Sequence, residues 1–130
     1  MKTWDKLLEF IPFTPAQNIT GEPAISPDGK FMTFLSDRDG PFDAWISQIG
    51  SGGLVNITKG RFQLMNNPNT RSAGFSGDGS QVWFMQQVTA RPLKWTSWIS
   101  PALGGAPRTF VEGGLEPIWS PDGRNVAYHT

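Results

Sequence analysis

The chain has 130 residues, of which 38% are hydrophobic and 12% aromatic, enough for one packed domain and too apolar for intrinsic disorder. Eleven basic residues balance eleven acidic ones, and this formal net charge of zero argues against a general nucleic-acid or anionic-membrane surface. Cysteine is absent, which excludes disulfides, thiolate metal sites and a cysteine nucleophile, and the apolar runs are too short for membrane insertion.

The first predicted elements are two strands within residues 4–20. Their pattern is recognised because the tripeptide Asn-Ile-Thr at 18–20 occurs again at 56–58, an offset of 38 residues. The same offset, without a gap, matches four further pairs: Asp5 with Asp43, Leu7 with Trp45, Leu8 with Ile46, and Ile11 with Ile49. The charges in this segment also make it a poor secretory signal, so the chain is expected in the cytoplasm by default.

The next predicted element is a hairpin between strands at 22–26 and 30–36, joined by Ser26-Pro27-Asp28-Gly29. A type I turn favours Ser, Pro, Asp and Gly at its four positions, and Gly at the fourth takes a positive φ that returns the chain antiparallel. The pattern occurs three times along the chain, at Ser26, Asp28 and Gly29, at Ser76, Asp78 and Gly79, and at Ser120, Asp122 and Gly123.

Two more strands are expected after each of the first two hairpins. The tripeptide Trp-Ile-Ser at 45–47 recurs at 98–100, and a Gly-Gly pair follows each copy, so each unit holds four antiparallel strands. The remaining predicted strands are 43–49, 53–58, 71–76, 80–87, 95–101, 106–111, 115–119 and 124–129. Residues 59–70 and 87–94 are interpreted as longer connections.

Four-stranded units of about 40–50 residues are typical of β-propeller blades, so the predicted fold class is all-β. The motif P-x-x-S-P-D-G, followed by W-I, G-G and a short strand ending in I-T, resembles the TolB-type β-propeller repeat, which is related in architecture to WD-repeat propellers. The resemblance covers nearly the whole chain, and Gly77 in place of Pro is one departure from it. It implies a six-bladed ring that binds proteins or peptides, in relatives that are periplasmic.

Blade boundaries follow from the repeat within a single propeller domain of residues 1–130. Residues 21–58 and 68–111 form whole blades, 4–20 supply strands three and four of a blade, and 115–130 supply strands one and two. Three blades' worth of chain does not close a ring at normal blade twist. We therefore expect a homodimer with six blades, two of them shared, and the alternative is that the sequence is a piece of a longer propeller.

The motifs contain no predicted catalytic, metal or cofactor residue. Asp28, Asp78 and Asp122 are interpreted as turn residues, because Asp at the third position commonly bonds local backbone. His129, the only histidine, has no second histidine with which to share a metal, and is expected at a solvent-facing or interface position.

The tryptophans leave one alternative open, which is that an exposed ring stacks on a sugar. Trp45, Trp98 and Trp119 occupy repeat positions and are expected between blades, whereas Trp95 lies outside the alternation and is the candidate exposed tryptophan.

The leading functional hypothesis is a non-enzymatic scaffold that binds a protein or peptide, with no cofactor, no nucleic acid and no membrane insertion. A second hypothesis is a gating propeller on a peptidase of the prolyl oligopeptidase or tricorn type. A third is a glycan-binding propeller that uses exposed aromatics. The sequence identifies no ligand, since fold alone does not determine function.

Overall fold

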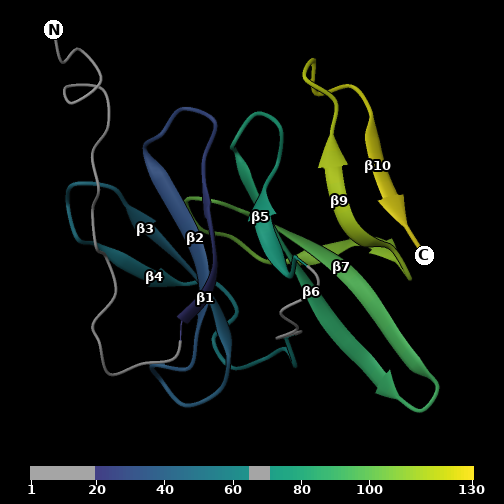
Figure 1. The fold of residues 1–130 in the computed structure, drawn as a ribbon. Coiled ribbons are helices and arrows are strands. Elements are labelled where there is room, and N and C mark those ends of the chain that lie inside the picture. The colour runs from purple at the N-terminus through teal and green to yellow at the C-terminus, as the bar shows by residue number, and fades with distance from the viewer. Residues whose placement is uncertain (1–19, 65–70) are drawn as a thin grey trace, which may run out of the picture.

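A computed structural model describes residues 20–64 and 71–130, with only the backbone described at residues 20–22. The described chain forms two four-stranded antiparallel sheets and a two-stranded sheet, arranged side by side (Figure 1). The strands expected within residues 4–19 lie outside the described residues. Within the described ranges the chain holds no helix long and apolar enough to span a membrane.

Each sheet follows the chain in order. Blade one contains β1 (Thr20–Ile25), β2 (Phe31–Ser36), β3 (Asp43–Gln48) and β4 (Leu54–Asn56). Blade two contains β5 (Ala73–Phe75), β6 (Gln81–Ala90), β7 (Leu93–Pro101) and β8 (Arg108–Glu112). The half blade contains β9 (Leu115–Trp119) and β10 (Val126–His129). The predicted all-β class and the ten strands expected after residue 20 are therefore present.

Strand register repeats from sheet to sheet. In each motif hairpin, the residue before the turn serine pairs with the third residue after the turn glycine: Ile25 with Met32, Phe75 with Val82, and Trp119 with Val126. Equivalent residues of the three hairpins therefore point to the equivalent face of their sheets, because side-chain direction alternates with a period of two along a strand.

Several strand boundaries differ from those predicted. β1 begins at Thr20, which the sequence placed at the end of the preceding strand, and a bulge between Gly21 and Ala24 accommodates the extra residues. β4 ends at Asn56 rather than at residue 58, because the side chains of Asn56 and Thr58 bind the start of β3.

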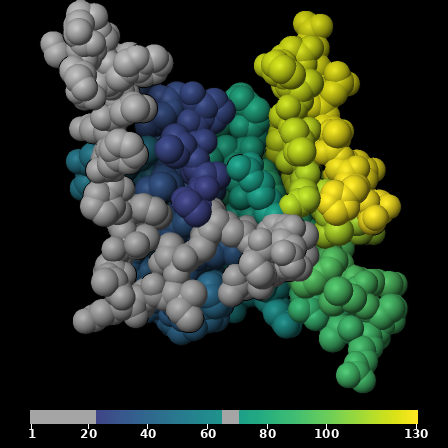
Figure 2. Space-filling view, viewed as in Figure 1, coloured from purple at the N-terminus to yellow at the C-terminus, as the bar shows by residue number. Residues whose placement is uncertain are grey.

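The predicted connection at 87–94 is wrong. These residues extend the β6–β7 hairpin, in which Gln87 pairs with Trp95 and Ala90 with Leu93 around a bulge. The bulge inserts one residue and so hides the alternation in the sequence. The extended hairpin projects beyond the rest of the described chain (Figures 1 and 2).

The main core lies between the two blades. Leu35 and Ile46 from blade one pack with Val82 and Phe84 from blade two, all buried. The connection after blade one adds Phe62, whose ring lies 4.9 Å from the rings of both Phe84 and Trp98. The sequence predicted only a longer connection here, but the ring of Phe62 completes the packing between the blades.

A second, smaller core joins blade two to the half blade. Trp83 and Met85 are buried on the face of blade two that looks away from blade one, and Leu115 and Trp119 pack against them. Trp119 also stacks on Phe110, with ring centroids 5.5 Å apart. Blade two is thus covered on both faces, and Trp119 lies between blades, as the repeat predicted.

The turns of successive sheets touch one another. A Cβ on Gly77 would lie 2.9 Å from Cβ of Trp119, and a Cβ on Gly79 would lie 3.0 Å from Cδ of Pro27. Gly77 therefore departs from the Ser-Pro-Asp-Gly pattern for a packing reason, since any side chain at this position would collide with the half blade.

These contacts generate a first prediction. Gly79 and Gly123 have nearly the same φ, 74° and 71°, but a Cβ added at Gly79 would have neighbours within 4 Å, and one added at Gly123 would have none. Replacing Gly123 with Val is expected to cost about 1 kcal/mol from backbone strain, and Gly79→Val is expected to cost more because a clash is added. Urea unfolding at one fixed protein concentration measures both, and equal losses would contradict the packing argument.

Candidate functional site

The three motif turns share one hydrogen-bond pattern. In the first, Ser26 Oγ donates to Asp28 Oδ1 at 2.6 Å, and Lys30 N donates to the same oxygen at 3.0 Å. Phe31 N donates to Ser26 Oγ at 2.9 Å, while Gly29 N donates to the Ser26 carbonyl at 2.8 Å. The serine hydroxyl thus links the carboxylate to the first residue of the second strand.

The other two turns repeat these bonds. Ser76 and Ser120 donate to Asp78 and Asp122, and the turn glycines Gly29, Gly79 and Gly123 have φ values of 72°, 74° and 71°, the sign expected from the sequence. Each carboxylate is engaged by donors from its own turn, which leaves it poorly suited to metal binding or catalysis. Among the described residues no group of three or more His, Asp or Glu side chains is placed to hold a metal ion.

These bonds lower the pKa of each turn carboxyl. For Asp28 and Asp122 the main cause is the serine hydroxyl, followed by the backbone N–H two residues on. For Asp78 the backbone N–H of Ser80 and the hydroxyl of Ser76 lower the pKa from 3.8 to about 2. In each case, hydrogen bonds to the ionised form stabilise it.

A second prediction concerns acid stability. Because the pKa of Asp78 is about 2 when folded and 3.8 ordinarily, its ionised form favours the folded state. That contribution is complete above about pH 4 and is lost as the pH falls toward 2. Asp78→Asn should therefore reduce the loss of stability between pH 4 and pH 2, measured by denaturant unfolding across that range.

The matched control for this prediction is Asp39→Asn, in the exposed β2–β3 turn. It should leave the acid dependence of the wild type unchanged. An Asp78→Asn profile that follows the wild type from pH 4 to pH 2 would contradict the assigned role of the carboxylate.

The first strands of the three sheets border a groove of about 700 Å³, here called the inner-strand groove. β1 contributes Ile25, which is 63% exposed, and β9 contributes Ile118, which is 68% exposed. Phe75 from β5 and Pro27 from the first turn also line it. The groove thus presents apolar side chains to solvent, which is uncommon on a surface that binds nothing.

Part of the groove lining is polar. Arg71 N donates to Oε1 of Glu116, and Oε2 of Glu116 lies 3.0 Å from Nε2 of His129. The hydrogen bond from Arg71 N, followed by that from His129, lowers the pKa of Glu116. His129 is exposed, as expected, and its partner is the carboxylate of Glu116. Sequence reasoning missed Arg71 and Glu116, because neither belongs to the motif.

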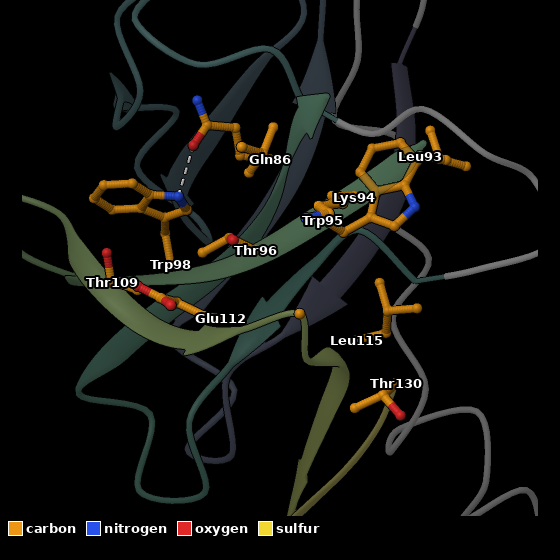
Figure 3. A pocket seen from close by; sticks show the side chains of 12 residues that line it. Gln86, Leu93, Lys94, Trp95, Thr96, Trp98, Thr109, Glu112, Leu115 and Thr130 are labelled. Atoms are coloured by element: carbon orange, nitrogen blue, oxygen red, sulfur yellow. Dashed lines mark hydrogen bonds between the residues drawn. The ribbon is translucent and has the colours of Figure 1, made fainter. Parts of the chain in front are cut away.

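The candidate tryptophan, Trp95, is half-buried rather than exposed. It lines a cavity of about 860 Å³ between the projecting β6–β7 hairpin and the half blade. Figure 3 shows Leu93 beside Trp95 on one side of this cavity and Leu115 with Thr130 on the other. Trp98 also lines this cavity and donates from Nε1 to Oε1 of Gln86 at 2.8 Å.

A buried polar network ties β3 to the segment after β4. The Asp43 carboxylate accepts from Asn56 Nδ2 at 2.8 Å, from Thr58 Oγ1 at 2.5 Å and from Gly60 N at 2.7 Å. Thr58 Oγ1 in turn accepts from Ala44 N at 3.0 Å. The Asn-Ile-Thr motif is thus structural in blade one, because both of its polar side chains are engaged.

Neither a protein-family model nor a curated protein matches the sequence. Solved structures do match. A protein assigned as TolB from Agrobacterium tumefaciens is 24% identical with a TM-score of 0.63, over 89% of this chain and 39% of that one. TolB from Acinetobacter baumannii is 18% identical with a TM-score of 0.68, over 89% of this chain and 28% of that one.

The fold is that of a TolB-type β-propeller. An acylaminoacyl peptidase in complex with a chloromethyl ketone also matches, at 17% identity and a TM-score of 0.53, over 82% of this chain and 20% of that one. The chain therefore spans well under half the length of each of these structures. The inner-strand groove is bordered by the first strands of the three successive sheets.

Proposed function

We propose that this TolB-type propeller module is a non-enzymatic scaffold that binds an extended peptide segment of a partner protein in the inner-strand groove. The observation that carries the proposal is the pair Ile25 and Ile118, which project from two first strands into one groove. Apolar side chains at the centre of a concave surface are typical anchors for a partner.

Backbone groups add to this recognition. β1, β5 and β9 each pair with one neighbour only in the described sheets, so their other edges offer N–H and C=O groups to a ligand. An extended peptide satisfies such edges through main-chain hydrogen bonds while its side chains fill apolar pockets. Arg71 and Glu116 in the groove lining would bind polar groups of the peptide through their charges.

The module acts in this proposal as part of a closed six-bladed ring. Two copies contribute three blades' worth each, and six is the blade number that the TolB-type resemblance implies. In a closed ring the first strands of all the blades border one central channel, which would extend the groove between successive pairs of blades.

A third prediction tests the groove. A displayed library of random linear peptides is selected on the wild-type protein, and the affinity of the best peptide is then measured by fluorescence anisotropy. Ile118→Arg should weaken binding by about tenfold or more, since burying an isoleucine contributes roughly 1.5–3 kcal/mol.

The control variant is Leu103→Arg, because Leu103 is 84% exposed and does not line the groove. It should leave the affinity unchanged. Failure to select any peptide, or equal losses in the two variants, would overturn the proposed function.

A gating propeller attached to a peptidase is the second candidate. The observation that favours it is the match to part of the acylaminoacyl peptidase. Under this hypothesis the surface of the chain would bind a folded hydrolase domain, and the random-peptide selection would yield no ligand for the groove.

A further inference from the structure

We propose that the inner-strand groove selects peptides that carry a carboxylate, and that the guanidinium of Arg71 binds this group. The inference rests on the proposed function and names the class of peptide that the groove accepts. It gives a role to a charged side chain in a groove that is lined mainly by apolar residues. In this assignment Arg71 determines specificity, while Ile25 and Ile118 supply the apolar contacts.

The first observation is the state of Arg71. Among the described residues that line the groove, Arg71 and Glu116 alone are charged, and Arg71 is exposed. Within residues 20–64 and 71–130 the one ion pair joins His129 to Glu116, so no carboxylate of this part of the chain pairs with the guanidinium. A guanidinium presents its N–H donors in a planar fork, and a carboxylate matches this geometry through bidentate hydrogen bonds.

The second observation is that the carboxylate of Glu116 is already engaged within the chain. Arg71 N donates to Oε1, and Nε2 of His129 lies 3.0 Å from Oε2. Each oxygen therefore has a partner, and the Glu116 side chain is only 28% exposed. A cationic group of a peptide would compete with these donors, whereas an anionic group would meet the guanidinium of Arg71 without displacing a described carboxylate.

The third observation is that the backbone of Arg71 is fixed beside the groove. Glu116 on β9 has a φ of 49°, which residues other than glycine rarely adopt. Hydrogen bonds at both of its carboxylate oxygens and from its N to Sδ of Met85, at 3.5 Å, hold it in this conformation. Since Glu116 binds Arg71 N just before β5, Arg71 begins from an ordered backbone and loses less conformational freedom on binding.

The other side chains of the lining offer no competing charge. The hydroxyl of Ser76 is satisfied, because its Oγ donates to Asp78 Oδ1 at 2.7 Å and accepts from Gln81 N at 3.1 Å. The rest of the lining consists of glycine, alanine, proline and larger apolar or aromatic residues. A charged hydrogen bond formed by Arg71 in these surroundings is less screened by water than one on an open surface.

Peptide selection in two formats tests the inference. Random linear peptides are displayed with the C-terminus either free or blocked, and both libraries are selected on the wild-type protein. We expect the recovered peptides to carry Asp or Glu at a preferred position, or to come from the free-terminus library alone. The first result assigns the carboxylate to a side chain and the second to the peptide terminus, and either one supports the inference.

A double-mutant cycle then assigns the carboxylate to Arg71. The variant Arg71→Gln keeps the backbone N–H that binds Glu116, so it removes the charge without removing that contact. It should weaken binding of the best acidic peptide by about tenfold or more, because hydrogen bonds between charged groups are strong. It should have little effect on the same peptide after its carboxylate is replaced by an amide. Fluorescence anisotropy measures each affinity.

The matched control is Arg108→Gln, because Arg108 is exposed on β8 and does not line the groove. It should bind the acidic peptide as tightly as the wild type does. Both variants should give the circular dichroism spectrum of the wild type, which shows that each is folded. Equal weakening in the two variants would overturn the assignment to Arg71.

The outcomes separate this inference from the proposed function. Peptides that lose affinity for Ile118→Arg but bind Arg71→Gln as well as the wild type would overturn only the inference. Recovery of peptides enriched in Lys or Arg instead of acidic residues would also overturn it, since Glu116 would then be the recognised charge. Recovery of no peptide from either library would overturn the proposed function, and the inference with it.

Discussion

The structure depends on one constraint, which is that each blade has two apolar faces and each must be covered. Phe84 of blade two faces blade one, and Met85, the next residue, faces the half blade. Both are fully buried, because alternation along β6 sends them to opposite sides of one sheet. A lone blade would leave both of these faces in water, so the stability of a blade cannot be separated from that of its neighbours.

The same constraint explains how the repeated turns are used. A turn that only reversed the chain would tolerate Pro at its second position in all three copies. Gly77 occurs instead where the half blade packs against the turn, and Trp119 fills the space that a proline ring would need. Gly74 is small for a reason within its own sheet, since its Cβ would lie 2.8 Å from Nε1 of Trp83, its partner across β5 and β6. The deviation at Gly77 therefore marks a contact between sheets.

Local chemistry made much of the fold predictable from the sequence. The Ser-x-Asp-Gly turns, the alternating strands beside them and the Gly-Gly connections are set by neighbouring residues, and they recur often enough to show a period. Trp119 could also be placed between blades, because it occupies a repeated position.

Contacts between distant residues could not be predicted in the same way. The β6–β7 extension is hidden by a bulge, and Phe62 contributes to the core from a segment that lacks any repeat. The inner-strand groove was missed because it is made by the approach of three strands, and Ile25 or Ile118 alone has the pattern of an ordinary strand residue. Arg71 and Glu116 come together from positions 45 residues apart, with no motif to join them.

The two complete blades hold their third strands in place in different ways. In blade one the network fixes β3 against the segment after β4, whereas blade two has Thr96, Thr109 and Val111 at the three equivalent positions. β7 is held instead by its long ladder with β6, which runs from Gln81 to Ala90.

Both devices fix the register of a third strand, because a shift of one residue would turn its apolar side chains to the wrong face of the sheet. In blade one Asp43 sets the register through Asn56, Thr58 and Gly60, and in blade two the ladder between β6 and β7 sets it.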